Sequence, residues 1–263
     1  MNRRKTLPVA LVALLALAAP ACHHSNRQPV IRVNPEFVSL SKEQVFQRGE
    51  EWFAKRKYPK ARTYYQHVYE TYPNDPLGRR ALLRVADTYF MQGNPVNLVE
   101  SQYKYRDFIN RYPSSDRADY AMLQIAMVSY KQMEKPDRDP AKMHEALEKF
   151  DDMIRAYPKS PLRAEADARR QDVLNRLAKH EHLIAQYYMK RHSWNAALLR
   201  LNGLIDEYGQ YNERDAAFFD LATCLQHLGR KGEARLYYER VVTEFPKSEY
   251  ASRAKKNLAS TSS

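Results

Sequence analysis

The chain has 263 residues, and 43 Lys and Arg against 31 Asp and Glu give it a formal net charge of +12. Its 7 glycines form no phosphate-binding loop, and this scarcity with abundant Ala, Leu, Arg, Lys and Glu is typical of an all-helical chain. The length allows one domain or a short array of repeats.

Residues 1–21 predict a secretion signal. Three basic residues at positions 3–5 precede an apolar run at 9–19, which is too short to span a bilayer because a helix needs about 20 residues. The segment LAAPAC ends at Cys22 and resembles the bacterial lipobox, although Ala19 occupies the position where that motif prefers leucine. The resemblance implies that Cys22 becomes a lipid-modified N-terminus. Ordinary signal cleavage, which leaves a free thiol, is the alternative.

His23 follows this cysteine where an aspartate would retain a lipoprotein at the inner membrane. The resemblance therefore implies a protein anchored to the outer membrane, on its periplasmic side, by several acyl chains. Loss of residues 1–21 removes three basic residues and lowers the net charge from +12 to +9. Behind a secretion signal, this charge favours an acidic partner protein or anionic lipid head groups rather than nucleic acid.

Four aromatic-proline steps, each followed by a short polar turn, and a weaker Tyr208-Gly209 step mark helix ends along the chain, because proline cannot continue a helix. The four steps begin at Tyr72, Tyr112, Tyr157 and Phe245. Counted back from the proline of each step, or from Gly209 in the weaker one, a small residue stands twelve positions earlier: Ala61, Ser101, Ala146, Ala197 and Ala234. Eight before stands a large one: Tyr65, Tyr105, Phe150, Leu201 and Tyr238. Five before stands an apolar one: Val68, Phe108, Met153, Leu204 and Val241.

Five segments in phase indicate the second helix of a tetratricopeptide-type repeat. The first helix is in register in two repeats, where Gly49 and Trp52 precede Ala61, and Ala222 and Leu225 precede Ala234. We expect an all-α, right-handed solenoid of five helical hairpins, in which each hairpin buries its apolar side only against its neighbours. Such a stack binds peptides or partner domains, and nothing in it implies catalysis.

The expected domains are a signal at 1–21, a lipidated linker at 22–40 and a repeat domain at 41–260. The repeats are expected at about 41–75, 76–114, 115–159, 160–211 and 212–248, followed by a C-terminal helix. A polar insertion at 133–143 interrupts the third repeat. The span 161–191 lacks glycine and any later proline, which predicts a single helix of about 45 Å. The alternative is two helices with a break near residues 177–181.

Local motifs resemble one family. The string DRDP at 137–140, RLAK at 176–179, the pair Tyr187-Tyr188, and then Arg191 and Trp194 are similar to the BamD family of lipoproteins from the outer-membrane β-barrel assembly machinery. The resemblance covers the chain from about residue 41 to 258. It implies a non-enzymatic scaffold without cofactors that works in the folding and insertion of β-barrel proteins.

The same resemblance implies two binding regions. The C-terminal repeats dock the barrel-forming subunit BamA, alongside other subunits of the Bam complex, and Arg200, Arg191 and Trp194 are the expected contact residues. An arginine suits this role because its planar fork pairs with a carboxylate through two hydrogen bonds. A solvated helix arginine without a partner is the alternative for Arg200.

The N-terminal repeats are expected to receive the C-terminal signal strand of unfolded outer-membrane proteins. This strand ends in an aromatic residue, so an aromatic groove suits it. Tyr58, Tyr69 and Tyr72 are the candidates for the groove, whereas Trp52, Tyr65 and Tyr89 fall on positions that predict core packing. The family's basic residue at the start of the first repeat's second helix is replaced by Pro59.

The sequence gives less support to a catalytic site, a metal site or a different function. The chain contains no His-Glu-x-x-His, cysteine ligand pair or Gly-x-Ser-x-Gly. His180 and His182 are two residues apart, so on a helix they cannot share a metal ion and are expected to pack as flat side chains. Cys224 lies in an apolar stretch and is expected to be a buried thiol. A secretin or pilus pilotin, or a cell-division coordinator of the same repeat class, is the alternative function.

Overall fold

The structure is a computed structural model, and it describes residues 35–261. The chain divides into two units, Met1–Ser39 and Leu40–Ser263. In the first unit the structure describes one short helix, α1 (Pro35–Ser39). The predicted signal, Cys22 and most of the predicted linker lie outside the described residues.

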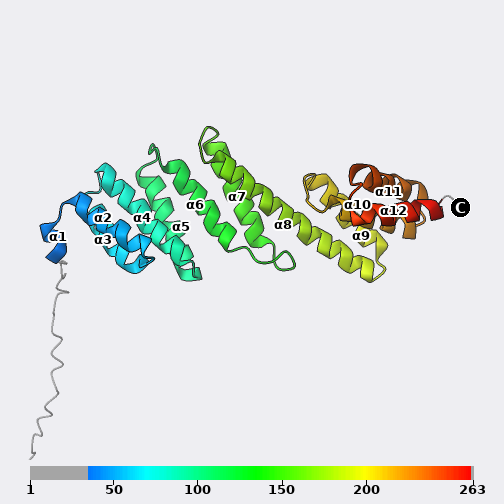
Figure 1. The fold of residues 1–263 in the computed structure, drawn as a ribbon, viewed down its shortest axis with the longest axis horizontal. Coiled ribbons are helices and arrows are strands. Elements are labelled where there is room, and N and C mark those ends of the chain that lie inside the picture. Colours follow the sequence, from blue (N-terminus) through cyan, green and yellow to red (C-terminus); the bar gives the residue numbers. More distant parts are fainter. Residues whose placement is uncertain (1–34, 262–263) are drawn as a thin grey trace, which may run out of the picture. The chain divides into compact units, whose positions relative to one another are not determined.

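The second unit is all helical throughout its described residues, as expected, and its helices follow one another along a stack (Figure 1). They are α2 (Lys42–Ala54), α3 (Tyr58–Thr71), α4 (Pro76–Gln92), α5 (Pro95–Arg111), α6 (Ala118–Lys131), α7 (Ala141–Ala156), α8 (Arg163–Lys190), α9 (Trp194–Glu207), α10 (Arg214–His227), α11 (Lys231–Glu244) and α12 (Glu249–Thr261). No described helix is both long enough and apolar enough to cross a membrane.

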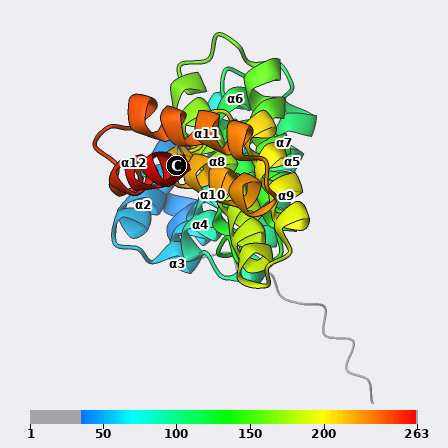
Figure 2. The same cartoon turned by 90° about the vertical axis from the view of Figure 1, so that its right-hand side faces the viewer.

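Helices α2 to α11 form five successive hairpins, and α12 adds a final helix. Each helix packs on the one before it and the one after it in the chain. Figure 2 views this stack from its C-terminal end, where α10, α11 and α12 stand in front of the earlier helices. The predicted solenoid of helical hairpins is therefore confirmed.

The three repeat positions identified in the sequence form the core of this stack. Every residue assigned to the small, large and apolar positions of the five repeats is buried. The first-helix residues Gly49, Ala222 and Leu225 are buried as well. A Cβ atom at Gly49 would lie 2.6 Å from Cε1 of Tyr65, so glycine is required for this close approach. Trp52 and Tyr89, which were expected in the core, are only half-buried, and the cationic groups of Lys60 and Arg62 lie over their rings.

Helix α8 is a single unbroken helix of 28 residues, which confirms the predicted long helix. Its first half packs with α6 and α7 through Ala166, Val173 and Leu177. Its second half joins the C-terminal core through Ala178 and Ala185. The helix therefore connects the two hydrophobic clusters.

The helix ends at a tight turn before Trp194. His192 adopts a left-handed backbone conformation there, with φ of 56°. The polar insertion of the third repeat connects α6 to α7 and contacts α8, because Nδ1 of His180 lies 2.7 Å from the carbonyl oxygen of Pro136.

Candidate functional site

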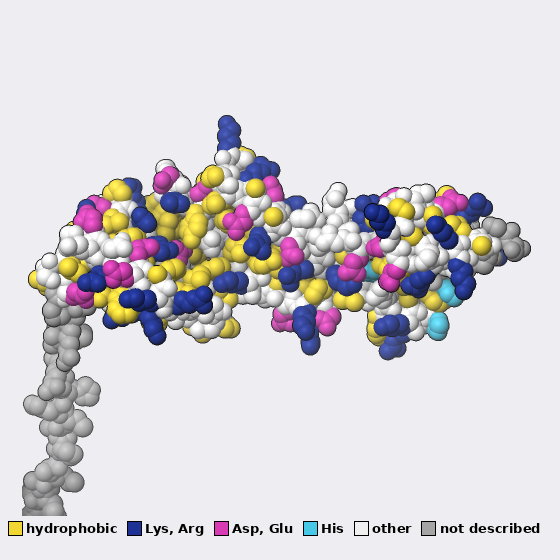
Figure 3. All heavy atoms as spheres, viewed as in Figure 1, with side chains coloured by type: hydrophobic (Ala, Val, Ile, Leu, Met, Phe, Trp, Pro, Cys, Tyr) yellow, Lys and Arg dark blue, Asp and Glu magenta, His cyan; other side chains and the backbone are white. Residues whose placement is uncertain are grey.

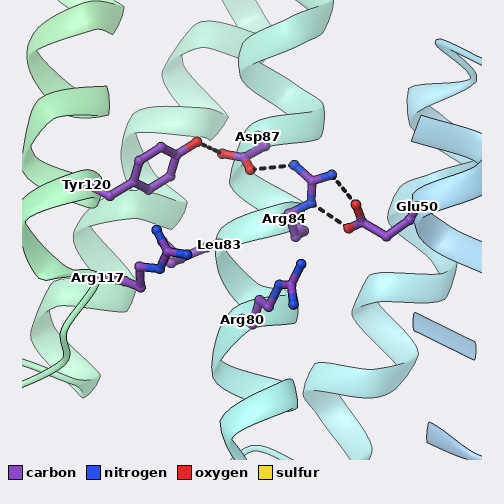
Figure 4. Close-up of a pocket in the computed structure, with 7 residues that line it drawn as sticks. All are labelled: Glu50, Arg80, Leu83, Arg84, Asp87, Arg117 and Tyr120. Atoms are coloured by element: carbon purple, nitrogen blue, oxygen red, sulfur yellow. Dashed lines mark hydrogen bonds and ion pairs between the residues drawn. The ribbon is translucent and has the colours of Figure 1, made fainter. Parts of the chain in front are cut away.

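A basic cavity of about 270 Å³ lies between α2, α4 and α6 (Figure 4). The residues that line it are Glu50, Arg80, Leu83, Arg84, Asp87, Arg117 and Tyr120. In Figure 3, hydrophobic side chains gather in a hollow over the same part of the stack. The cavity thus combines several cationic groups with an apolar wall.

One side of the cavity is closed by an ion pair between two helices. The guanidinium of Arg84 on α4 donates to both carboxylate oxygens of Glu50 on α2, with Nε–Oε1 at 2.7 Å and Nη2–Oε2 at 2.6 Å. Burial opposes ionisation of Glu50, but hydrogen bonds from Arg84 and Tyr65 outweigh it and hold the pKa of Glu50 below its ordinary value. Burial likewise opposes the Arg84 cation, whose pKa is nevertheless raised by Glu50.

The same arginine reaches a third carboxylate oxygen. Nη1 of Arg84 donates to Oδ2 of Asp87 at 3.1 Å, and the hydroxyls of Tyr105 and Tyr120 donate to Oδ1 at 2.6 Å and 2.8 Å. Burial raises the pKa of Asp87, although these donors favour the charged form. Since the four residues come from α4, α5 and α6, the network holds successive helices in fixed register.

The opposite rim carries two arginines with no such partner. Arg80 on α4 and Arg117, at the start of α6, are exposed, and neither forms an ion pair with a carboxylate among residues 35–261. The guanidinium of Arg80 lies 4.9 Å from the ring centroid of Phe46. Their free donors can therefore bind an anion from outside, and a carboxylate fits them because guanidinium groups bind carboxylates in a planar, bidentate way.

A second hollow of about 430 Å³ extends from this rim. It shares Arg80, Leu83 and Arg117 with the cavity, and Phe108 and Arg79 also line it. The two spaces together offer cations at the junction and apolar surface on either side. This arrangement suits an extended ligand that carries both a negative charge and a large apolar group.

The three predicted groove tyrosines are not brought together. Tyr58 begins α3 and packs its ring against Phe53, with centroids 5.3 Å apart. Tyr69 and Tyr72 lie at the other end of this helix, about 20 Å away along its axis. Tyr72 is exposed below the ammonium of Lys42, and Tyr69 is half-buried with Arg111 over its ring. At most Tyr69 and Tyr72 can belong to one surface.

The three residues expected to contact BamA lie around the α8–α9 turn. Trp194 stacks on His227 with ring centroids 3.9 Å apart and an interplanar angle of 3°. Arg191 lies over the ring of Tyr187 at 4.8 Å. Arg200 is exposed on α9, and its Nη1 donates to Oε2 of Glu181 at 3.1 Å. Its neighbour Leu199 is 74% exposed, which leaves an apolar group beside the ion pair.

The remaining candidates have structural roles. His182 is buried, its Nε2 lies 2.9 Å from Oδ2 of Asp220, and its ring meets Tyr211 edge-on. It packs as a flat side chain, as expected, but it also joins a polar network that the sequence did not indicate. Cys224 is buried, and burial raises the pKa of its thiol to about 12. Among residues 35–261 no group of three His, Cys, Asp or Glu could hold a metal ion.

The sequence analysis missed the basic cavity itself. Arg80 and Arg84 are separated from Glu50 by about 30 residues, and Arg117 by more than 60, so no local spacing links them. The i, i+3 spacing of Arg84 and Asp87 on a helix was the one available signal. Such a pair is common on solvated helix faces, and only the packing of α2 and α6 turns it into a site.

Known proteins are similar to this chain over most of its length. The sequence profile of the YfiO family, described as outer membrane lipoprotein, matches residues 39–240. An outer membrane protein assembly factor BamD from Neisseria meningitidis is 25% identical over 258 residues, 94% of each chain. A BamD from Caulobacter vibrioides is 23% identical and covers 88% of this chain and 73% of its own.

Solved structures give a distant likeness. The TPR2AB-domain:pHSP90 complex of yeast Sti1 matches with a TM-score of 0.46 and 13% identity, over 84% of this chain and 82% of that one.

Proposed function

Because this chain belongs to the YfiO family of outer membrane lipoproteins, we propose that it is a non-enzymatic scaffold for outer-membrane protein assembly. Its relatives named outer membrane protein assembly factor BamD support this role. In this proposal the N-terminal repeats receive the C-terminal signal strand of an unfolded β-barrel protein. The C-terminal repeats dock on BamA within the Bam complex.

The basic cavity between α2, α4 and α6 is the observation that carries the substrate part of the proposal. A C-terminal signal strand offers a free α-carboxylate and an aromatic last residue. The carboxylate fits the unpaired guanidinium groups of Arg80 and Arg117, and the aromatic ring fits the apolar wall that includes Leu83 and Phe108. Arg84 does not bind the strand in this scheme, because Glu50 and Asp87 already occupy its donors.

The test is peptide binding to the mature chain. A peptide with the C-terminal strand of a β-barrel protein is compared with the same peptide carrying a C-terminal amide. We expect the amide, and separately the double substitution Arg80→Gln with Arg117→Gln, to lower affinity about tenfold, since charge-assisted hydrogen bonds are lost.

Arg155→Gln with Arg163→Gln is the matched control, because both arginines are partly or fully exposed near the α7–α8 turn and their loss changes the net charge equally. This control should leave affinity unchanged. Equal binding of the free acid and the amide would remove the cavity from the proposal.

Docking on BamA is supported by the exposed surface around Arg200. Its ion pair with Glu181 is open to solvent, so the guanidinium can exchange this partner for a carboxylate of another protein. Arg200→Glu should weaken BamA binding at least about tenfold while the helical content stays the same. Unchanged affinity would exclude Arg200 from the interface.

Anchoring through a lipid on Cys22 is part of the same proposal. Cys22→Ser should release the protein from the outer membrane into the soluble periplasmic fraction. Retention of this variant in the membrane fraction would argue against the anchor. Affinity purification of the detergent-solubilised protein tests the assignment as a whole: we expect BamA to co-purify, and recovery of secretin or pilus proteins without BamA would contradict it.

A further inference from the structure

The turn between α2 and α3 concentrates positive charge on one edge of the stack. Lys55, Arg56, Lys57 and Lys60 are all exposed, and none forms an ion pair with a carboxylate among the described residues. The acidic residues that precede them are already engaged. Glu50 is bound to Arg84, and Glu51 is bound to Arg48 with Oε2–Nη1 at 3.0 Å. The turn therefore presents four uncompensated cations to solvent.

Aromatic rings lie among these cations. The ammonium groups of Lys60 and Lys55 lie 3.6 Å and 5.0 Å from the ring centroid of Trp52. Phe53 packs edge-on against Tyr58 beside them. Tryptophan, tyrosine and lysine share an apolar body with a polar tip, and this combination suits the region between lipid head groups and acyl chains.

The next turn on the same edge adds exposed apolar side chains. Met91 at the end of α4 is 47% exposed, and Val96 and Val99 at the start of α5 are 74% and 60% exposed. Arg62 ties the two turns together, because it lies over the ring of Tyr89 and donates to the side chain of Gln92. In Figure 1 both turns lie along the lower edge of the stack, and in Figure 3 that edge beneath α2–α5 mixes Lys and Arg with hydrophobic side chains.

We propose that this edge, formed by the α2–α3 and α4–α5 turns, rests on an anionic phospholipid surface. Lipid phosphates neutralise the four cations, and the exposed apolar side chains enter the head-group boundary. The inference goes beyond the proposed scaffold function and does not depend on substrate or BamA binding. It identifies a second membrane contact besides the predicted lipid on Cys22.

A lipid surface fits this edge better than an acidic protein for two reasons. Cations, aromatic rings and exposed apolar groups are spread over two turns, which matches a laterally uniform partner. About 20 residues separate Cys22 from the start of α2, and an extended chain of this length spans at most about 70 Å. An anchored chain therefore keeps the edge close to the membrane at high effective concentration, where weak contacts suffice to orient the protein.

Vesicle binding tests the proposal. The mature chain from residue 22, with Cys22→Ser so that no acyl chain dominates binding, is mixed with phosphatidylcholine vesicles with and without phosphatidylglycerol. We expect binding only to the anionic vesicles, weakening as salt rises. Each lysine near an anionic surface strengthens partition of the protein onto the vesicles about fivefold. The double substitution Lys55→Gln with Lys57→Gln should therefore lower the partition coefficient about 25-fold.

The matched control is Lys159→Gln with Lys247→Gln, which removes the same charge from exposed lysines of the α7–α8 and α11–α12 turns. It should lower partition less than about threefold. Equal losses in the two double variants would overturn the proposal, because binding would then follow net charge alone. Absence of binding to anionic vesicles would overturn it as well.

Fluorescence locates the contact. In a Trp194→Phe background Trp52 is the one remaining tryptophan of the mature chain. Anionic vesicles that carry a bromine label near the head groups should quench its emission, and Val96→Glu should reduce this quenching. Vesicle binding without quenching would show that a different part of the protein surface contacts the lipid. Cross-linking of this edge to an acidic protein in the outer membrane, with no cross-link to lipid, would assign it to a protein partner instead.

Discussion

The first and last repeats share one packing scheme but differ in the polarity of their cores. Tyr65 and Tyr238 occupy the same repeat position, four residues after the buried Ala61 and Ala234. The Tyr65 hydroxyl donates to Glu50 at 2.8 Å, whereas the Tyr238 hydroxyl lies 3.3 Å from the hydroxyl of Thr223, which stands at the position equivalent to Glu50.

The presence of Glu50 rather than a threonine at this position changes the polar contacts around the first repeat. Glu50 binds Arg84, Arg84 reaches Asp87, and Asp87 accepts hydrogen bonds from two further tyrosines. In the last repeat the Tyr238 hydroxyl instead donates to the neutral side chain of Gln226 at 2.9 Å. A repeat can therefore keep its shape while one side chain decides whether charge enters between its helices. In the first repeat this charge lines the basic cavity.

Among the substitutions that compare the two repeats, removal of the Arg84 guanidinium should have the largest effect on the free energy of unfolding. Arg84→Met leaves Glu50 and Asp87 without their cation, and we expect it to lower the free energy of unfolding by about 3 kcal/mol. The counterpart in the last repeat, Thr223→Val, should cost only about 1 kcal/mol because it removes neutral hydrogen bonds. Urea unfolding followed by circular dichroism measures both. Equal losses would show that the two networks contribute alike.

Glycine substitutions should give smaller effects of opposite sign. Gly49→Ala places a methyl group against Tyr65, which is buried and held by Glu50, so we expect a loss of about 2 kcal/mol. No atom lies within 4 Å of a Cβ at Gly203 on α9, and Gly203→Ala should stabilise the chain by about 0.5 kcal/mol. Thermal unfolding of both variants checks this pair, and stabilisation by Gly49→Ala would contradict the observed packing.

The charged first repeat should also respond to acid. The folded-state pKa of Glu50 is held below its ordinary value of 4.5, so its contribution to stability is present above that value and is lost as pH falls through the lowered pKa. The stability difference between the wild type and Glu50→Gln should therefore shrink below pH 4.5. Asp87 titrates in both proteins, so its raised pKa does not produce the difference.

Thr223→Val provides the comparison, because a hydroxyl does not titrate in this range. Its stability difference from the wild type should stay constant across the same acid titration. If the stability difference between the wild type and Glu50→Gln also stayed constant as pH fell, Glu50 would not be ionised in the folded chain.

A final prediction concerns reactivity and involves no change in stability. Burial raises the pKa of Cys224 to about 12, so very little thiolate is present at neutral pH. In the Cys22→Ser chain, alkylation of Cys224 by iodoacetamide should be at least about a hundredfold slower in the folded state than in urea. Mass spectrometry measures the two rates, and rapid modification of the folded protein would show that the C-terminal core opens readily.

The sequence alone determined the repeat pattern and therefore the fold. The aromatic-proline steps and the residues twelve, eight and five positions before the proline identified core residues such as Ala61, Tyr65 and Val68. An uninterrupted run of helix-compatible residues predicted α8. These features were readable because helix periodicity is local, so the position of a residue within its repeat decides which side it turns toward the neighbouring helix.

Only the tertiary structure decided which polar groups meet. The separation of Tyr58 from Tyr69 and Tyr72 along α3 already follows from helical rise, and the three were grouped by residue type instead. Arg84 meets Glu50 across 34 residues, and His182 meets Asp220 across 38. Contacts of this range depend on the exact stacking of helices that are distant in sequence. The rim that carries Arg80 and Arg117 arises in the same way, from the packing of α2, α4 and α6 around one space.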